Sequence, residues 1–399
     1  MSFGEKILEL LCTCQEINVE LAIQLSRPNN LKIPAYIAKR GFNDYGIFNA
    51  YDFINYNQKT RFDGGKIEHL EFLDKLHFNA QQLEIIDTKV KDFSPLRRQY
   101  NLNTLVLDKN PHLVDISFLS ELYQLKDLSL TRNNIENLAH LSKLQHLQNL
   151  NIAGNCISDI SPLANLKTLS SLHLSHNSIT DLSPLADLTE LNRITLNNSR
   201  TKIKDISPLA NLKKLTSINF SSNAIKDLSP LSDLNLLTRI DLSNNKIADL
   251  SPLQKSKQIE HLYLADNQIS SSEPLQKLVA ITWLFCQNNK LTNLKGLEKM
   301  KKLSMLRLDN NQISDLSAIS KLPKLSDLEL NNNKISDLSP LSSVKQLTTI
   351  DLTNNLITDL SPLENLKHLY YINIKRNPIS EQEIERFKRV RPKVVVYNK

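Results

Sequence analysis

An asparagine recurs through most of this 399-residue chain at a spacing of 22 residues. The register extends back to Thr88, and it is irregular after Asn110 and after Asn177, where Ser199 takes one position. Its asparagines are Asn110, Asn133, Asn155, Asn177, Asn223, Asn245, Asn267, Asn289, Asn311, Asn333, Asn355 and Asn377. A fixed period predicts a stack of similar coils, which overrides the two or three domains that the length alone suggests.

One coil shows how the frame predicts local structure. The alternation Leu150-x-Ile152 predicts a short strand with one buried face. Asn155 then falls at a sharp turn, where its side-chain amide is predicted to pair with backbone groups that the turn leaves free. Ser161 followed by Pro162 predicts a short helical turn, with the serine as its cap. Neighbouring coils must cover the two flat ends of each coil.

The frame LxxLxLxxNxIxDLSPLxxL resembles the 22-residue class of leucine-rich repeats, over about residues 80–399. Members of this class include a regulatory subunit of protein phosphatase 1 and the bacterial internalins. The resemblance implies a right-handed α/β solenoid with a parallel concave sheet and short helical turns on the convex side, whose strand face binds another protein. With helical caps at both ends, the expected domains are 1–62 (N-terminal cap), 63–379 (solenoid) and 380–399 (C-terminal cap).

The N-terminal segment lies outside the regular repeat. Residues 36–62 are rich in aromatic side chains, which we interpret as a cap over the first coil. An aromatic pocket for a ligand or peptide is the alternative. Residues 62–76 resemble a degenerate first repeat, with Phe62 in its strand and Ile67, Leu70, Leu73 and Leu76 in its returning half.

The C-terminal segment reads as a second cap. Ser380 with Glu383 predicts a capping box, and Val394–Tyr397 a closing strand. Ile384, Phe387 and Val390 are predicted to form the helical face on the last coil. The basic side chains here are interpreted as the solvated face of the helix rather than as a nucleic-acid or acidic-membrane site; they are Arg386, Lys388, Arg389, Arg391 and Lys393.

Side chains that alternate out of the strands face the concave surface. Most are small or polar, but three consecutive coils carry aromatic, Met and Arg residues flanked by charges. Trp, Tyr and Arg dominate interface energetics, so we predict a protein-binding site there, unless the aromatics pack only on each other or on a terminal extension. Its residues are His261, Tyr263, Trp283, Phe285, Met305, Arg307, Asp327, Glu329, Asp351 and Arg239.

An aspartate also recurs once per coil, as at Asp159 and Asp181. A calcium ladder is conceivable, but one carboxylate per coil is a thin ligand shell, so hydrogen bonding to the turn backbone is the preferred interpretation. The loop with Arg200 and Lys202 carries two extra residues, either a neutral insertion or a contact loop. We expect no metal and no cofactor.

These observations favour a non-catalytic interaction module, expected to be a monomer. The chain has no glycine-rich phosphate loop, no HExxH and no nucleophile elbow, and Cys286 is predicted to point inward, away from His261. The function expected is the binding of a protein partner, with regulation of a phosphatase or other enzyme as one version. The alternative is an internalin-like surface or secreted protein that recognises a host protein. Few cysteines and no recognisable signal peptide or membrane span favour the cytoplasm, unless a signal was removed.

Overall fold

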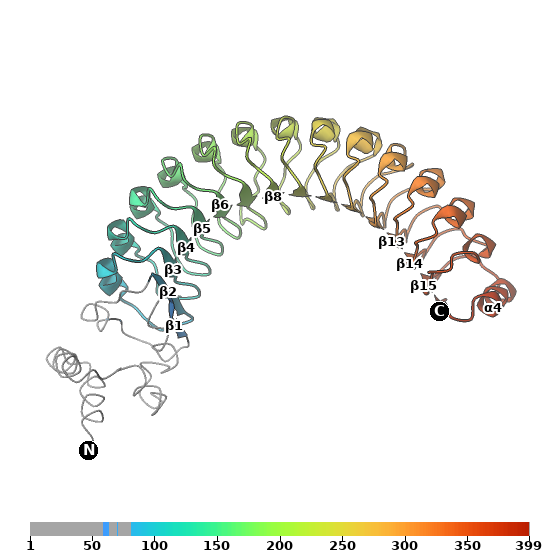
Figure 1. The fold of residues 1–399 in the computed structure, drawn as a ribbon, viewed down its shortest axis with the longest axis horizontal. Helices are drawn as coiled ribbons and strands as arrows, with labels where there is room; N and C mark the ends of the chain where they lie inside the picture. The colour runs from blue at the N-terminus through green and yellow to red at the C-terminus, as the bar shows by residue number, and fades with distance from the viewer. Residues whose placement is uncertain (1–58, 64–69, 71–80, 399) are drawn as a thin grey trace, which may run out of the picture. The chain divides into compact units, whose positions relative to one another are not determined.

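The computed structural model describes residues 59–63, 70 and 81–398. The chain divides into two compact units, Met1–Leu191 and Asn192–Lys399. Within each unit, short parallel strands alternate with short 3-10 helices, and the strands lie along the inner side of the coils (Figure 1). Each unit is therefore a solenoid of stacked coils, as the period predicts.

The first unit contains six described strands, each paired in parallel with the next along the chain. They are β1 (Lys59–Asp63), β2 (Gln82–Ile86), β3 (Thr104–Val106), β4 (Asp127–Ser129), β5 (Asn149–Asn151) and β6 (Ser171–His173). Its 3-10 helices are η4 (Ser94–Arg98), η5 (Ser117–Glu121), η6 (Ala139–Lys143), η7 (Ser161–Leu163) and η8 (Ser183–Leu185).

The second unit repeats this plan. Its strands are β7 (Arg193–Thr195), β8 (Ser217–Asn219), β9 (Arg239–Asp241), β10 (His261–Tyr263), β11 (Trp283–Phe285), β12 (Met305–Arg307), β13 (Asp327–Glu329), β14 (Thr349–Asp351), β15 (Tyr371–Asn373) and β16 (Val395–Tyr397). Its helices are η9 (Ser207–Leu209), η10 (Ser229–Leu231), η11 (Ser251–Lys255), η12 (Glu273–Lys277), η13 (Leu297–Lys299), η14 (Ser317–Lys321), η15 (Ser339–Ser343), η16 (Ser361–Leu363) and α4 (Glu381–Val390).

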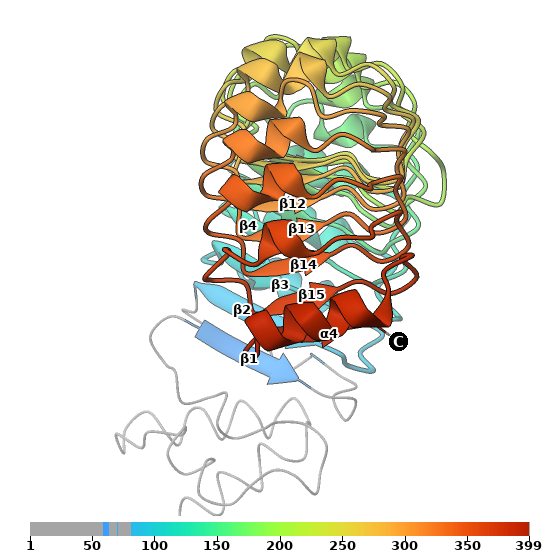
Figure 2. The ribbon, with the colours of Figure 1, turned by 90° about the vertical axis from the view of Figure 1, so that its right-hand side faces the viewer.

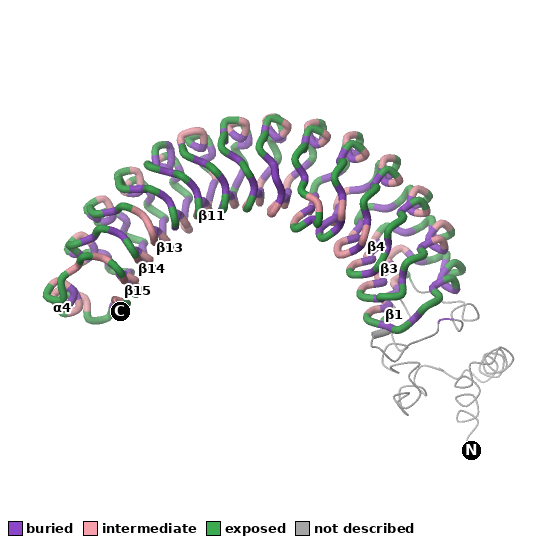
Figure 3. Tube along the Cα trace, turned by 180° about the vertical axis from the view of Figure 1, so that it is seen from behind, coloured by how far each residue is buried: buried purple, intermediate pink, exposed green. Residues whose placement is uncertain are grey.

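Aliphatic columns fill the interior of each coil, where buried stretches of chain recur in every turn (Figure 3). In the coil that begins at β10, Leu262 and Leu264 point inward from the strand and meet Leu275 and Leu278 from the returning half, all without exposed surface. Each buried Leu or Ile contributes about 1.5–3 kcal/mol to stability. The burial pattern of the strands, with the middle residue inside, confirms the predicted alternation.

The asparagine register is a hydrogen-bonded ladder, as predicted. The Oδ1 atom of Asn267 accepts the Ile247 N–H of the preceding coil at 3.0 Å. Its Nδ2 atom donates to the carbonyl of Leu242 in that coil (3.0 Å) and of Leu264 in its own (3.1 Å). One side chain thus links two coils and satisfies backbone groups that the turn would otherwise bury unpaired.

The turn also requires a left-handed backbone conformation at the residue before each ladder position. This residue has a positive φ in almost every coil, for example +56° at Asp266, +55° at Asn244 and +73° at Gly154. Only glycine, and to a lesser extent asparagine and aspartate, adopts this left-handed conformation readily. This explains why asparagine pairs such as Asn244-Asn245 are common in the frame.

The recurring aspartate, and not the serine, organises the turn before most of the 3-10 helices in the described residues. Oδ1 of Asp159 accepts the Ser161 N–H at 2.8 Å, and Oδ2 accepts the Ser161 hydroxyl at 2.9 Å. The preferred interpretation of the aspartates is confirmed, whereas the predicted serine cap is wrong, because the serine hydroxyl donates to the aspartate instead. The same bonds at Asp181 hold the pKa of its carboxyl below the ordinary value, with the backbone N–H of Ser183 as the main cause.

At the C-terminal end of the second unit, α4 lies against the last coil (Figure 2). The Ser380 hydroxyl accepts the Glu383 N–H at 3.2 Å, as predicted for the cap, and β16 pairs with β15 as the predicted closing strand. Ile384 and Phe387 are buried on the coil, but Val390 is half exposed, so its predicted place on the packed face is wrong.

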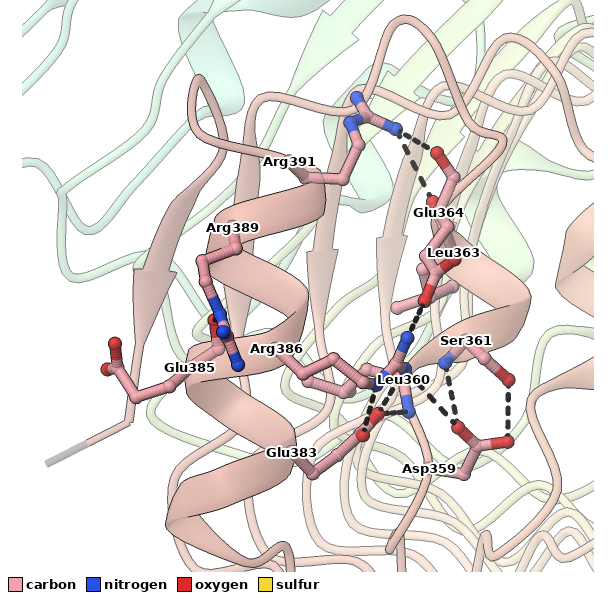
Figure 4. Close-up of polar contacts among 10 residues, drawn as sticks. All are labelled: Asp359, Leu360, Ser361, Leu363, Glu364, Glu383, Glu385, Arg386, Arg389 and Arg391. Carbon is pink, nitrogen blue, oxygen red and sulfur yellow. Dashed lines mark hydrogen bonds and ion pairs between the residues drawn. The ribbon is translucent and has the colours of Figure 1, made fainter.

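Two of the basic residues of α4 and its C-terminus are not simply solvated. Arg386 donates twice to Glu383 at 2.7 Å and also pairs with Glu364 (Figure 4). Arg391 donates to the carbonyls of Glu364 (2.8 Å) and Leu366 (2.7 Å). The solvated-face interpretation is therefore wrong for these two residues, because they join the helix to backbone and side chains of the last coil.

The N-terminal predictions fall mostly on residues 1–58, 64–69 and 71–80, which lie outside the described residues, and this includes the aromatic cap and Ile67, Leu73 and Leu76. Phe62 lies in β1 opposite Ile85, which confirms the predicted strand, and Leu70 is buried. The domain boundaries stay predictions. None of the helices within the described ranges is long and apolar enough to span a bilayer.

Candidate protein-binding face

The ten predicted binding residues all come from β9–β14 of the second unit, and the strand pairing aligns them in two columns. One column runs Arg239, His261, Trp283, Met305, Asp327 and Thr349, and the other runs Asp241, Tyr263, Phe285, Arg307, Glu329 and Asp351. Arg239 is exposed, and the other nine predicted residues are partly exposed. We call these two columns the aromatic–acidic face.

The first column holds a stacked pair of rings. The centroids of His261 and Trp283 lie 4.3 Å apart, with 20° between the ring planes. Burial lowers the pKa of His261, the Arg239 guanidinium lowers it further, and Glu260 opposes the shift. The imidazole therefore stacks on the indole as a neutral ring at neutral pH.

The second column, together with Arg239 of the first, forms a continuous series of ring and charge contacts. The Arg239 guanidinium lies 5.0 Å from the centroid of Tyr263, which meets Phe285 edge-on at 5.0 Å and 85°. The Arg307 guanidinium lies 4.8 Å from the centroid of Phe285 and 3.3 Å from a Glu329 carboxylate oxygen. The aromatics do pack on each other, as the alternative interpretation held, yet they keep exposed surface. Their contacts hold them in place before any partner arrives.

Not every carboxylate oxygen at the acidic end of the face accepts a hydrogen bond from the chain. Asp327 Oδ2 accepts the Thr349 hydroxyl at 2.8 Å, but Asp327 Oδ1 is buried without a partner. Asp351 accepts the Thr353 N–H at 2.9 Å and the Asn373 amide at 3.0 Å.

Sequence reasoning missed a third outward position, two residues beyond the end of each strand. On β12 this is Asp309, which is 7% exposed and accepts the Asn331 N–H at 3.1 Å. Burial, reinforced by the neighbouring Glu329 carboxylate, raises the pKa of Asp309 to about 7. Continuing the alternation two residues past the strand would have found this position.

Several buried polar atoms on this face lack hydrogen-bond partners. Of the five such atoms within residues 59–63, 70 and 81–398, four belong to Gln287 (Oε1), Arg307 (Nε), Asp327 (Oδ1) and Thr353 (Oγ1). Buried polar atoms are normally paired, and these four lie on or directly beside the aromatic–acidic face.

Cys286 lies directly behind this face and takes no part in it. The residue is 2% exposed, and burial raises the pKa of its thiol to about 12. The thiol is therefore protonated and points inward, as the alternation predicts. Across the described residues, no group of three or more His, Cys, Asp or Glu side chains is arranged to hold a metal ion.

The comparisons agree with the coil geometry. The family model for leucine-rich repeats in two copies matches residues 123–165, 167–211, 213–255, 235–277, 279–321, 301–343 and 345–385. These matches cover more than half of the chain, which therefore belongs to the leucine-rich repeat family. Such folds are generally non-catalytic modules for protein–protein interaction.

Solved structures add closer likenesses. An internalin from Listeria monocytogenes is 35% identical, with a TM-score of 0.71, over 76% of this chain and 88% of that one. A leucine-rich repeat protein from Leptospira interrogans is 24% identical, with a TM-score of 0.81, over 92% and 97% of the two chains. The latter likeness shows the fold alone. None of the curated proteins compared with the chain matches it significantly.

Proposed function

We propose that the aromatic–acidic face binds a protein partner, with Tyr263, Trp283, Phe285 and Met305 as anchors. The single observation that supports this most is the presence of two ring pairs, on neighbouring strands, that keep exposed surface. Aromatic anchors of this kind contribute most of the affinity at protein interfaces. Because the rings are already held by each other and by Arg239 and Arg307, little ordering is needed on binding.

The charged side chains of the face would orient the partner. Arg307, Asp327 and Glu329 border the anchors on neighbouring strands, with Asp351 on the next strand. Charges at such a position raise association rates and select partners more than they add affinity. In this proposal the solenoid performs no chemical step of its own.

Trp283 is the only tryptophan of the protein, so its fluorescence reports on this face alone. We expect the double variant Tyr263→Ala/Trp283→Ala to lose at least tenfold in affinity for a captured partner. The matched control is Arg193→Ala/Thr195→Ala on β7, at the same two register positions, which should bind as the unaltered protein does. Unchanged capture by the double variant, with its melting temperature preserved, would rule the proposal out.

Two versions of this function call for different partners. The likeness to an internalin, at 35% identity over 88% of that chain, favours a surface or secreted protein that recognises a host protein. An intracellular regulator of a phosphatase or other enzyme, in the cytoplasm, is the other version and follows from the repeat class. Cell fractionation combined with phosphatase co-purification separates them, since only the second version predicts both cytoplasmic recovery and a bound phosphatase.

A further inference from the structure

The acidic end of the face carries much more negative charge than its own basic groups balance. Strands β12–β14 and the residues just beyond them carry the carboxyl groups of Asp309, Asp327, Glu329 and Asp351 but the single guanidinium of Arg307. The protein as a whole carries a formal net charge of +7. The acidity is therefore local to this part of the sheet.

Arg307 forms an ion pair with only one of these carboxylates, that of Glu329, at 3.3 Å. Its guanidinium lies against both the Phe285 ring and Glu329, and its Nε atom has no partner. The Oδ1 atom of Asp327 is likewise unpaired. At this end, the partly exposed carboxylates of Asp327 and Glu329 lie directly beside the partly exposed side chains of Trp283 and Met305.

We propose that the partner of this face presents a lysine or arginine next to a large apolar side chain. The cation lies at the carboxylates of Asp327 and Glu329, and the apolar side chain packs on Trp283 and Met305. The inference deepens the proposed function and rests on it. Charge complementarity favours a basic segment of another protein over an acidic segment.

The affinity of the face for a basic partner should increase with pH. Asp309 lies beside Glu329 of β13 and two residues after Arg307 of β12. Asp351 lies next to Glu329 on β14, and the corresponding position on the β11 side is the uncharged Gln287. A bound cation stabilises the ionised forms of Asp309 and Glu329. Binding should therefore release the proton that Asp309 holds below about pH 7. Affinity for a basic partner should therefore rise about tenfold between pH 6 and pH 8.

The test pans a random 12-residue peptide library against the full-length chain. The selected peptides should be enriched in Lys or Arg within three positions of an aromatic, Leu or Met residue. Their titration should change Trp283 fluorescence, and Asp327→Asn/Glu329→Gln should weaken binding at least tenfold. The control Glu121→Gln/Glu136→Gln removes two exposed carboxylates elsewhere and should leave affinity unchanged.

The outcomes separate the two proposals. Peptides that require Trp283 but lack basic residues, or that are acidic, overturn this inference and leave the proposed function standing. Peptides that bind Trp283→Ala equally well overturn both, and a library that yields no binder overturns this inference. If Asp327→Asn/Glu329→Gln is poorly folded, a charge swap replaces it. A peptide with Lys→Glu should bind the Glu329→Lys variant better than it binds the unaltered chain. Failure to do so counts against the inference.

Discussion

Strands β3–β6 of the first unit and β10–β12 of the second share one inner frame but differ in what they turn outward. In the first unit, outward side chains are small and bond to each other: Thr104 and Asn149 both donate to Asp127, at 3.2 and 2.5 Å. In the second, the same register positions hold stacked rings and a guanidinium. Inward positions therefore determine the structure of the coil, whereas the outward side chains are free to differ between coils.

Substitutions of inward leucines should destabilise the two units to the same extent. Leu172→Ala on β6 and Leu262→Ala on β10 each remove a fully buried side chain, and each should cost about 2–5 kcal/mol of unfolding free energy. Leu172→Met and Leu262→Met should cost under about 1.5 kcal/mol. Denaturant titration measures both pairs. A large difference between the two alanine variants would show that the units are not built on equivalent cores.

The asparagine ladder gives the next largest effect. Asn155→Ala and Asn267→Ala should each cost about 1–3 kcal/mol, because each leaves one buried N–H and two carbonyls unpaired. Asn288→Gly is a control next to a ladder residue. It removes an exposed amide that bonds only to Asp266, and glycine adopts the positive φ of 56° at this position without strain. If the control destabilised the chain as much as the ladder variants do, the ladder would have no special role.

The frame could be predicted from the sequence because each coil repeats the same physical requirements. Leu262 inward and Trp283 outward follow from alternation alone, and the bonds of Asn267 follow from an amide at a buried turn. Prediction failed where a polar group had more than one possible partner, either in the same turn or in another coil. Asp159 captures the Ser161 hydroxyl, and Arg391 reaches carbonyls 25 or more residues away.

The residues of the aromatic–acidic face could be predicted from the sequence, but the contacts between them could not. Periodicity placed Tyr263 and Phe285 on neighbouring strands, but it could not show whether their rings meet edge-on. Asp309 was missed because it lies beyond the strand, where alternation is no longer obvious. Its raised pKa depends on burial and on Glu329, two quantities that exist only once the coils are stacked.

Asp108 and Asp309 occupy the same register position in the two units and should respond to substitution in opposite ways. Asp309 has a pKa of about 7 in the folded chain, above its ordinary 3.8, so the folded state holds a proton that the unfolded state releases between about pH 4 and 7. Stability falls as pH rises through that window. Asp309→Asn keeps the shape of the protonated carboxyl and should add about 1–2 kcal/mol at pH 8, with little gain near pH 4.

Asp108→Asn should instead lower stability, by about 1 kcal/mol. Oδ1 of Asp108 accepts the Ser129 hydroxyl at 2.7 Å and the Thr131 N–H at 2.8 Å, and an amide is a weaker acceptor than a carboxylate. Melting curves of both variants at pH 4 and pH 8 check the pair. The same sign for both at pH 8 would show that the environment of Asp309 is not the cause.

The smallest effect on stability is expected from adding or removing calcium at the aspartates of the convex turns. These turns are alike in both units. Asp159 in the first unit and Asp315 in the second each use both carboxylate oxygens on the serine two residues ahead. A carboxylate engaged in this way, once per coil, offers little to a calcium ion, which requires six to eight oxygen ligands. Adding a chelator should therefore leave the melting temperature of the full chain unchanged, and adding millimolar calcium should not raise it. A rise of several degrees would mean that an ion binds the folded state selectively, and the turns would then be held by metal as well as by their own serines.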